Sequence, residues 1–482
     1  MILQPTSQLT VPLTKGYSDK SRVYFEQAAE KRLYWKNRNA YYSSYLMQYF
    51  AFLIPAGSRV AELGCGTGDL LNAVKPSFGL GLDFSANILE IASERFPDLK
   101  FLNYDVEDMQ IGEKFDYIII SDLFHTSQDI QKILRNIKSM STDTTRIVIS
   151  NYNYLWEFPV KTAELLGLKQ PSPFANWLSP RDIKNLLELS GFESIKHDKK
   201  LFIPFYIPFL STLFNKFIAN IPILNKLAMV DFFVARPVAG EVKEYSVSII
   251  IPAKNEAGNI ENAIRQTPFF GSAQQFVFIE GHSDDGTYDE MLKVKQTYKD
   301  KDILVIRQSG KGKGNAVREG FEMATGEILI ILDADLTTPP EDLPKFYDAL
   351  KAGKGEFING CRLVYPMERG AMRPLNLIAN KTFGKIFSYL LGQDVKDTLC
   401  GTKALMKADY QRIKENRSYF GDFDPFGDFD LLLGTAKLNL KIVEIYVKYK
   451  DRVYGTTQIS RFKHGWMLLK MTLFAARKSK FL

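Results

Sequence analysis

Short runs of hydrophobic residues recur along the chain, and segments with apolar residues at helical spacing separate them. A parallel strand buried on both faces reads as a continuous apolar run, so this alternation predicts α/β domains. In the first half the runs are Arg59–Leu63, Leu80–Phe84, Lys100–Asp105, Phe115–Ile120, Arg146–Ser150, Ser194–Phe202 and Met229–Ala235. Ser179 followed by Pro180 predicts a helix start, and Gly191 predicts its end.

The strand–helix pattern restarts after a short charged link, Glu241–Glu244. The second set of predicted strands is Val247–Ile251, Gln275–Glu280, Ile303–Arg307 and Glu327–Leu332. We therefore expect two α/β domains with doubly wound sheets, over residues 1–240 and 245–482. The two alternations differ in spacing, so they are not copies of one repeat.

The composition is that of a soluble globular protein, with 45% hydrophobic and 24% charged residues among 482. Three cysteines lie far apart without a CxxC pair, which argues against a zinc site or a disulfide framework and favours a reduced, cytoplasmic compartment. The N-terminus lacks the apolar core of a signal peptide. The most apolar uncharged stretch is Leu201–Asn215, which contains two prolines. A membrane span needs about 18 apolar residues, so we expect none.

The formal net charge is +7, and residues 442–482 alone carry nine Lys/Arg against two acids, a local excess of +7. A local basic patch predicts a phosphate-rich partner or an anionic membrane surface, and a solvated helix face is the alternative. Phe462, Trp466, Leu469 and Leu473 recur at helical spacing beside basic residues, a pattern typical of an interfacial helix. We expect peripheral binding at the inner face of the membrane, and no nucleic-acid partner. Packing of the same stripe on the sheet is the competing interpretation.

A glycine-rich turn follows the first predicted strand. It has the pattern E-x-G-x-G-x-G from Glu62 to Gly68, and Asp83 ends the next strand nineteen residues after Gly64. A carboxylate at that position can accept both hydroxyls of a ribose. Because Glu62 would repel a phosphate, the pattern argues against a dinucleotide site and favours the cationic end of S-adenosylmethionine.

Residues 34–237 therefore resemble the class I S-adenosylmethionine-dependent methyltransferases. The resemblance implies that Glu62, Gly64 and Gly66 hold the methionine part of the cofactor, and that Asp83 binds its ribose. It implies Asp105 and Val106 at the adenine, and Asp122 beside the methyl group. A Rossmann-like module without a ligand is the alternative. The aromatic residues at 34, 35, 41 and 42 form either a lid or core packing, and His125 is a candidate base.

Two aspartates follow the most apolar strand of the second half, in Asp333-Ala334-Asp335. Carboxylates so close together repel each other unless a cation lies between them. Mg²⁺ or Mn²⁺, bridging to substrate phosphates, would resolve this conflict.

Three other motifs precede the two aspartates, which makes four in order: PAKNE at 252–256, EGHSDDGT at 280–287, GKGKG at 310–314 and DAD at 333–335. Together they resemble the family-two glycosyltransferases of GT-A fold, and more narrowly the dolichyl- or polyprenyl-phosphate sugar synthases. The resemblance implies a nucleotide-sugar donor and Asp335 as the main metal ligand, with Asp333 on the ribose or the metal. It also implies substrate contacts from Pro252, Asn255, Glu256, Glu280, Ser283, Lys313, Arg362 and Arg373, the two arginines holding an acceptor phosphate.

The chain departs from that family at two positions: Glu280-Gly281 replaces the usual pair of aspartates, and Thr337 stands where glutamine is frequent. Asp430, with Asp428 second, matches the family's acidic acceptor-side residue and is a candidate general base. A helix cap or a surface acid is the structural alternative for Asp430.

We therefore expect a bifunctional enzyme that transfers a sugar to a polyprenyl-phosphate lipid or a glycan and also transfers a methyl group. Two other interpretations stay open. One is a glycosyltransferase with a non-catalytic methyltransferase-like scaffold, and the other is a methyltransferase with a nucleotide-sugar binding module.

Overall fold

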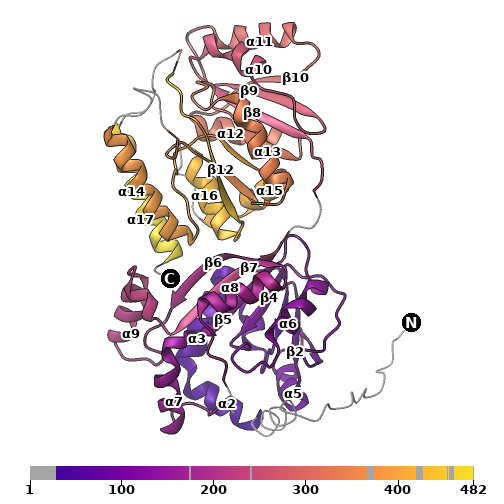
Figure 1. Cartoon of the computed structure of the whole chain (residues 1–482), viewed down its shortest axis with the longest axis vertical. Coiled ribbons are helices and arrows are strands. Elements are labelled where there is room, and N and C mark those ends of the chain that lie inside the picture. Colours follow the sequence, from indigo (N-terminus) through magenta and orange to yellow (C-terminus); the bar gives the residue numbers. More distant parts are fainter. Residues whose placement is uncertain are drawn as a thin grey trace, which may run out of the picture. The chain divides into compact units, whose positions relative to one another are not determined.

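The chain divides into two compact units, Met1–Pro237 and Val238–Leu482, in the computed structural model (Figure 1). The structure describes residues 29–172, 175–238, 242–365, 374–419, 427–452, 454 and 461–480. Within these ranges, it does not describe the side chains of residues 29–31, 374–376, 418, 428 and 461–468.

The first unit is built on a seven-stranded sheet of order β3-β2-β1-β4-β5-β7-β6. Strands β1 to β5 are parallel, whereas β7 runs antiparallel to both of its neighbours. The strands are β1 Arg59–Leu63, β2 Phe78–Asp83, β3 Lys100–Asn103, β4 Tyr117–Ser121, β5 Arg146–Tyr152, β6 Phe192–Lys200 and β7 Val230–Pro237. The helices are α2 Ala29–Arg38, α3 Ala40–Leu53, α4 Asp69–Ala73, α5 Ala86–Arg95, α6 Ile130–Asn136, α7 Glu157–Leu165, α8 Pro180–Leu189 and α9 Leu210–Thr212. Short helical turns are η1 Ile137–Met140, η2 Tyr154–Trp156, η3 Leu213–Phe217, η4 Ile218–Asn220 and η5 Leu224–Leu227.

Helices cover both faces of this sheet because both faces of its strands are apolar. Along β4, Ile118 and Ile120 pack in a core that includes Leu134 of α6, whereas Ile119 packs in a second core that includes Phe50 of α3. Successive residues of a strand point to opposite faces, so one apolar run supplies both cores. The predicted doubly wound architecture is confirmed.

The predicted helix start at Ser179 is also confirmed. Ser179 Oγ accepts a hydrogen bond from the backbone N–H of Asp182, the Asp182 carboxylate accepts from the N–H of Ser179, and Pro180 is the first residue of α8. This reciprocal pair satisfies two backbone donors that a helix N-terminus leaves free. Gly191 follows the helix with a φ of 77°, a conformation that glycine adopts without strain.

The second unit is built on another seven-stranded sheet, of order β10-β9-β8-β11-β13-β12-β14. Its strands are β8 Val247–Ala253, β9 Gln274–Glu280, β10 Asp302–Arg307, β11 Ile328–Ile331, β12 Phe357–Cys361, β13 Lys403–Met406 and β14 Ile442–Tyr446. Its helices are α10 Ile260–Arg265, α11 Thr287–Thr297, α12 Lys313–Met323, α13 Leu343–Lys351, α14 Pro374–Leu391, α15 Lys407–Glu415, α16 Asp428–Lys437 and α17 Arg461–Ser479, with the turns η6 Ala257–Asn259, η7 Pro340–Asp342 and η8 Arg417–Tyr419. Strand β13 is antiparallel to β11 and β12. A strand-like run was predicted from Glu444, within β14, whereas β12 and β13 were not among the predicted strands.

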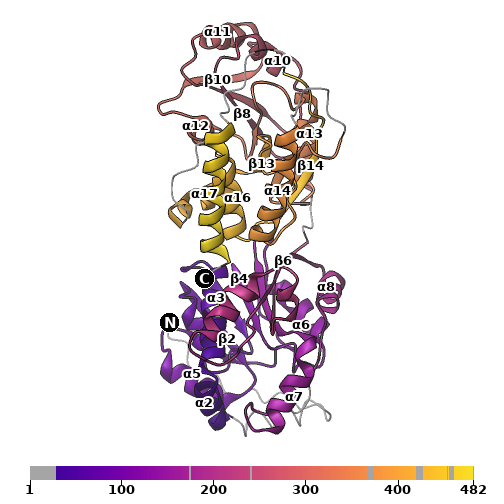
Figure 2. The same cartoon turned by 90° about the vertical axis from the view of Figure 1, so that its left-hand side faces the viewer.

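Helices α14 and α17 lie side by side in the second unit, as both Figure 1 and Figure 2 show. Met471 and Ala475 of α17 are buried, whereas Leu469 and Leu473 are 41% and 60% exposed. The described half of the apolar stripe therefore faces away from the core. Phe462 and Trp466, its other members, lie outside the described side chains.

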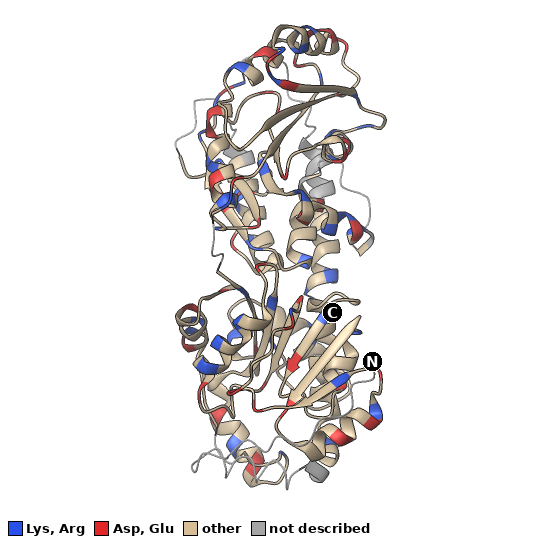
Figure 3. Ribbon diagram, turned by 90° about the vertical axis from the view of Figure 1, so that its right-hand side faces the viewer, with Lys and Arg blue, Asp and Glu red and all other residues tan. Residues whose placement is uncertain are grey.

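Searched over its described residues, the structure has no helix long and apolar enough to cross a membrane. Figure 3 shows Lys and Arg interspersed with Asp and Glu on the face of each unit that it presents.

Candidate active sites

The glycine turn of the first unit is held by the carboxylate of Asp83. Strand β1 leads into the turn and β2 ends at Asp83, so the two meet at the carboxyl edge of the sheet. Asp83 Oδ2 accepts a hydrogen bond from the N–H of Gly66 at 2.9 Å, and its Oδ1 accepts from the N–H of Ser85 at 3.0 Å. Gly66 has a φ of 52°, which disfavours any side chain there.

A cavity of about 980 Å³ opens above this turn. Six of the seven residues expected to bind the cofactor line it: Glu62, Gly64, Gly66, Asp83, Val106 and Asp122. Asp105 is not among the lining residues, and its Oδ1 accepts a hydrogen bond from the N–H of Glu107 at 2.9 Å. The structure therefore gathers the predicted set at one cavity, apart from Asp105.

Glu62 is a buried acid facing this cavity. Its side chain is 3% exposed, and its Oε2 has no hydrogen-bond partner among the described residues. Burial raises the pKa of Glu62 to about 8, and the nearby Lys36 ammonium opposes only part of that rise. A buried acceptor without a partner is costly, so a cationic donor in the cavity would bind favourably here. Such a site fits the ammonium group of S-adenosylmethionine.

Asp122, directly after β4, also lines the cavity. Its carboxylate accepts hydrogen bonds from the Tyr42 hydroxyl at 2.6 Å and the Ser150 hydroxyl at 2.9 Å. Burial raises the pKa of Asp122 above its ordinary value, although both hydroxyls oppose the shift. Tyr42 stacks on Tyr152, so the predicted lid cluster reaches the cavity through its tyrosine at position 42.

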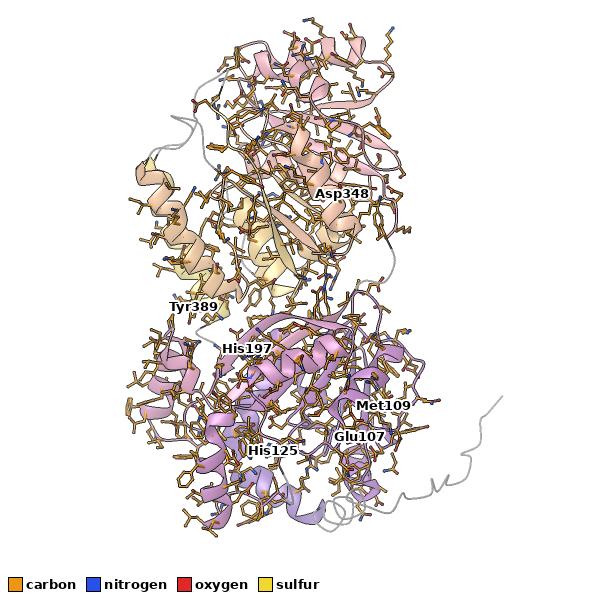
Figure 4. All side chains as sticks on the ribbon, in the orientation of Figure 1. Glu107, Met109, His125, His197, Asp348 and Tyr389 are labelled. Carbon is orange, nitrogen blue, oxygen red and sulfur yellow. The ribbon has the colours of Figure 1, made fainter. Side chains whose placement is uncertain are left out.

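His125, which Figure 4 labels, also lines the cavity, from the loop after β4. Its Nδ1 lies 3.2 Å from the carbonyl oxygen of Asn176, and its Nε2 has no partner among the described residues. Burial, together with the charge of Lys169, lowers the pKa of His125 to about 4. The imidazole is therefore neutral near pH 7. Because Nδ1 donates to the carbonyl, Nε2 keeps its lone pair as an acceptor.

The cavity also has many apolar lining residues. They come from α3, η2, α7 and the segment after β6, and include Leu46, Trp156, Val160, Phe202, Phe205 and Met229. The sequence analysis did not assign residues of this region to the site. The apolar stretch Leu201–Asn215 was the available signal, because an uncharged run beside a ligand-binding fold can serve as a substrate wall.

In the second unit, Asp333 pairs with Lys313. The Lys313 ammonium, at the start of α12, lies 2.5 Å from Asp333 Oδ1. Burial would raise the pKa of Asp333, but the charge and hydrogen bond of Lys313, together with the charges of Lys403 and Arg362, lower that pKa below its ordinary value. A Cβ at Gly401 would collide with both members of this pair. The segment Asp397–Gly401 (DTLCG) therefore needs a glycine at its last position.

Arg452 joins the second aspartate to Glu256. One of its terminal nitrogens lies 2.6 Å from Asp335 Oδ2, and the other lies 2.8 Å from Glu256 Oε1. Burial raises the pKa of Glu256 to about 7, although Arg452 opposes the shift. The sequence analysis counted Arg452 only within the basic tail and missed this position.

No group of three or more His, Cys, Asp and Glu side chains, within the part of the chain that the structure describes, could by itself hold a metal ion. Asp333 and Asp335 are oxygen donors, which suits a hard divalent cation that takes its other ligands from a diphosphate. The two carboxylates thus fit such an ion only together with a substrate.

The loops after β8 and β9 are tied together. Asn255, with a φ of 56°, donates its N–H to Ser283 Oγ at 3.0 Å, and its Oδ1 accepts from the N–H of Asp284 at 2.9 Å. Glu280 Oε1 accepts from the N–H of Ser283 at 2.5 Å. These bonds bring together Asn255, Glu280 and Ser283. Of the three, Asn255 lies in the loop that follows Pro252 at the end of β8.

The predicted acceptor-side residues are held by ion pairs. Arg362 donates to both oxygens of Asp397, at 2.8 and 2.9 Å, and lies 4.9 Å from the ring centre of Tyr449. Asp430 Oδ2 accepts from Arg417 at 2.8 Å. Arg373 lies outside the described residues, and so does the side chain of Asp428.

Asp430 lies near the GKGKG motif, because the N-terminus of its helix, α16, approaches that motif. A Cβ built at Gly427, which precedes α16, would lie 2.8 Å from the Cα of Gly314 in α12. Arg318 of α12 also lies 3.8 Å from the Asp430 carboxylate. Asp430 therefore sits beside the helix that carries Lys313.

The sheet order and the glycine turn of the first unit are those of a methyltransferase. The sheet order and the paired aspartates of the second unit are those of a GT-A glycosyltransferase. Comparison with known families agrees: residues 34–197 match a methyltransferase domain, and residues 248–413 match glycosyl transferase family 2. The chain belongs to glycosyl transferase family 2 and also carries a methyltransferase domain.

Two curated relatives are similar to the second half of the chain. Glycosyltransferase AglJ of Haloferax volcanii is 30% identical over 225 residues, covering 46% of this chain and 69% of that protein. Dolichol-phosphate mannosyltransferase of Pyrococcus furiosus is 28% identical over 242 residues, covering 46% of this chain and 64% of that protein. The chain thus spans only about two thirds of the length of these relatives.

A solved structure is similar to the first half. It is the S-adenosylmethionine-dependent methyltransferase of Mesorhizobium loti, 19% identical with a TM-score of 0.31, and the match covers 39% of this chain and 96% of that one.

Proposed function

We propose that this chain is a bifunctional enzyme that transfers a sugar from a nucleotide-sugar to a polyprenyl-phosphate or glycan acceptor and methylates a second acceptor. The observation that carries the proposal is the paired set of sites. In the first unit, Glu62 and Asp83 line one cavity with His125. In the second unit, Asp333 and Asp335 lie beside the loop that ends in Lys313.

S-adenosylmethionine fits the first unit, and when bound it would supply an electrophilic methyl group. Glu62 would pair with its ammonium group, and Asp83 would accept its ribose hydroxyls while keeping the glycine turn closed. Asp105 and Val106 remain the proposed adenine contacts. Asp122, fixed by the hydroxyls of Tyr42 and Ser150, would border the reacting centre.

His125 suits the orientation of the methyl acceptor. Its free Nε2 can accept a hydrogen bond from an attacking hydroxyl or amine, which aligns the nucleophile with the methyl group. A pKa of about 4 makes His125 a weak base, so we assign it a positioning role.

In the second unit, Pro252, Asn255, Glu280 and Ser283 would border the base and ribose of the donor. Lys313 would turn from Asp333 toward the diphosphate, since a phosphate is a stronger partner for its ammonium group. Mg²⁺ or Mn²⁺ would be held by Asp335, with Asp333 on the ribose or the metal, and would neutralise the leaving diphosphate. Glu256 and Arg452 lie directly beside that position.

Arg362 and Arg373 are the proposed contacts to an acceptor phosphate. A lipid phosphate is already an anion, so its attack requires no base, whereas a glycan hydroxyl requires one. Asp430 is the proposed base in the second case, with Asp428 as the alternative. The name of the Pyrococcus relative, a dolichol-phosphate mannosyltransferase, supports the lipid acceptor.

A peripheral membrane position supports the same acceptor. Leu469 and Leu473 are exposed on α17, and Ile378 on α14 is 63% exposed. Lys470, also exposed, lies next to Leu469, so this surface combines apolar and cationic groups.

Donor screening tests the proposal. The protein is incubated with Mn²⁺ and each common nucleotide-sugar, and release of free nucleotide is measured. Asp335→Asn should reduce that release at least about 100-fold, because it removes a charged metal ligand. Unchanged turnover in Asp335→Asn would refute the metal assignment. A thermal shift with S-adenosylmethionine tests the other unit, because a bound ligand stabilises the folded state. If saturating cofactor causes no shift, the methyltransferase unit is a scaffold.

A further inference from the structure

The segment after β6, residues 201–228, is the most apolar part of the first unit. Lys216 and Lys226 are its only charged residues, and no acid occurs between Asp198 and Asp231. It folds into α9 and the turns η3, η4 and η5 rather than into a strand or a long helix.

Three polar side chains of this segment point inward. Ser211, Asn215 and Asn220 are 0%, 2% and 6% exposed. Asn215 Oδ1 accepts from the N–H groups of Phe202 and Ile203 at 2.7 and 2.9 Å, and its amide donates to the Tyr41 hydroxyl at 3.1 Å. These three hydrogen-bonding side chains thus lie inside, where a globular protein in water more often places apolar ones.

The large apolar side chains point outward. The structure describes nineteen exposed large hydrophobic residues in the first unit, of which ten lie in this segment and six in 154–168. The ten are Phe205, Tyr206, Phe209, Leu210, Leu213, Phe217, Ile221, Ile223, Leu224 and Leu227. The six are Tyr154, Leu155, Phe158, Leu165, Leu166 and Leu168. We call these sixteen residues the apolar surface.

Two segments form this surface, and they are joined. The indole N–H of Trp156 donates to the carbonyl oxygen of Leu227 at 2.8 Å, and Asn153 donates to the carbonyl oxygens of Lys226 and Ala228. Soluble monomers rarely expose apolar patches of this extent, and a contiguous one marks an interaction site.

Backbone strain accompanies the exposure. Phe209 is 89% exposed with a φ of 63°, and Ile223 is 75% exposed with a φ of 80°. Bulky and β-branched residues are unusual at such positive φ angles. Glycine, which has no Cβ, adopts them without this cost, so both positions would be easier to form with glycine.

The apolar surface is continuous with the cavity of the methyltransferase unit. Phe205, 59% exposed, belongs to the surface and also lines the cavity, as does Leu168. A molecule held at the surface therefore has an apolar route toward Asp122 and His125.

We propose that the apolar surface inserts into the interface of an anionic lipid bilayer, and that the methyl acceptor is an amphiphile drawn from that bilayer into the cavity. Two lysines in a segment that contains no acid complement anionic headgroups, and aromatic and aliphatic side chains suit the boundary between headgroups and acyl chains. The acceptor assignment rests on the proposed methyltransferase function, whereas the docking does not.

A fluorescent label tests the docking in the full chain. The three native cysteines are buried, so an added exposed cysteine can be labelled selectively with an environment-sensitive nitrobenzoxadiazole dye. Leu213→Cys places the dye on the apolar surface, and Leu189→Cys, on α8 of the same unit, is the matched control at an exposed site outside it. With phosphatidylglycerol-containing vesicles, the dye at 213 should shift to the blue, and the dye at 189 should not. No shift at 213, or equal shifts at both sites, would overturn the proposal.

Two double variants test the chemistry of the docking. Phe209→Gly with Ile223→Gly removes apolar area at positions where glycine relieves strain, so the fold should be retained. Lys216→Glu with Lys226→Glu reverses the charge. Each should weaken the 213-label response to anionic vesicles about tenfold. An undiminished response in either one would contradict the corresponding part of the proposal, and so would an equal response to neutral phosphatidylcholine vesicles.

Two further measurements separate the outcomes. A thermal shift with S-adenosylmethionine on the labelled protein reports the methyltransferase function independently of lipid. If the cofactor shift persists while the vesicle response is absent, the docking alone is wrong. Sedimentation velocity without lipid tests the rival occupant, since a dimer that shields the 213 label would make the surface a contact between copies.

Discussion

Glu62→Gln probes the most unusual charge in the methyltransferase unit. Glutamine keeps the size of the side chain but cannot ionise, so it separates the charge of Glu62 from its shape. Because burial raises the pKa of Glu62 to about 8, most of the free protein carries a neutral Glu62 at pH 7. A cationic cofactor binds the ionised form, so binding must release a proton.

The magnitude follows from that pKa. At pH 7 about a tenth of the side chains are ionised, which costs cofactor binding about 1.4 kcal/mol relative to the fully ionised site. Between pH 9 and pH 6 the ionised fraction falls about 90-fold, and the affinity for S-adenosylmethionine should fall by about the same factor. In Glu62→Gln the affinity should be low and nearly independent of pH.

Stability should show the opposite dependence on pH. The folded-state pKa of Glu62 lies above the ordinary glutamate value of 4.5, so the folded state binds the proton more tightly. The resulting stabilisation is complete below pH ~4.5 and is lost as the pH rises to about 8, by roughly 3–5 kcal/mol. Glu62→Gln removes this contribution, so its free energy of unfolding should change less over that window.

Isothermal titration in two buffers of different ionisation enthalpy measures the proton release directly. We expect close to one proton released per cofactor bound at pH 7 by the wild-type protein, and close to none by Glu62→Gln. Equal proton release in the two proteins would refute the assignment of the raised pKa to Glu62. An affinity for the cofactor that does not change between pH 6 and pH 9 would refute its role in binding.

Three further predictions concern the two sites. Asp83→Ala should abolish S-adenosylmethionine binding by isothermal titration and leave nucleotide-sugar binding intact, because the glycine turn loses its anchor while the second unit is untouched; undiminished cofactor affinity would contradict this role. Arg452→Ala should raise the affinity of the nucleotide-bound protein for Mn²⁺ about tenfold, since Asp335 and Glu256 lose their cation; a manganese titration at saturating nucleoside diphosphate, followed by electron paramagnetic resonance, measures it, and weaker binding would count against a metal site there. Gly401→Ala should lower the melting temperature and weaken donor binding, at a cost of about 1–3 kcal/mol, because its methyl group collides with the ion pair beneath it; an unchanged melting curve would show that the ion pair can move aside.

The sequence by itself determined the two doubly wound folds and much of both sites. Continuous apolar runs that are buried on both faces form few structures other than parallel strands covered by helices. The carboxyl ends of such strands meet at one edge of a sheet, so Glu62, Asp83 and Asp333 could be assigned to sites from their positions alone. In each case the local pattern and the overall fold agree.

Tertiary structure decided what depends on distant partners. Arg452 reaches Asp335 across 117 positions of sequence, and no local pattern marks that pairing. From its composition, the segment 201–228 would be predicted to be buried. Hydrophobicity indicates that apolar groups avoid water, but it does not indicate which groups cover them. Only the folded chain turns Asn215 inward to Tyr41 and leaves Phe209 outside. A buried amide must find hydrogen-bond partners, and here one of them, Tyr41, comes from a helix far away in the sequence.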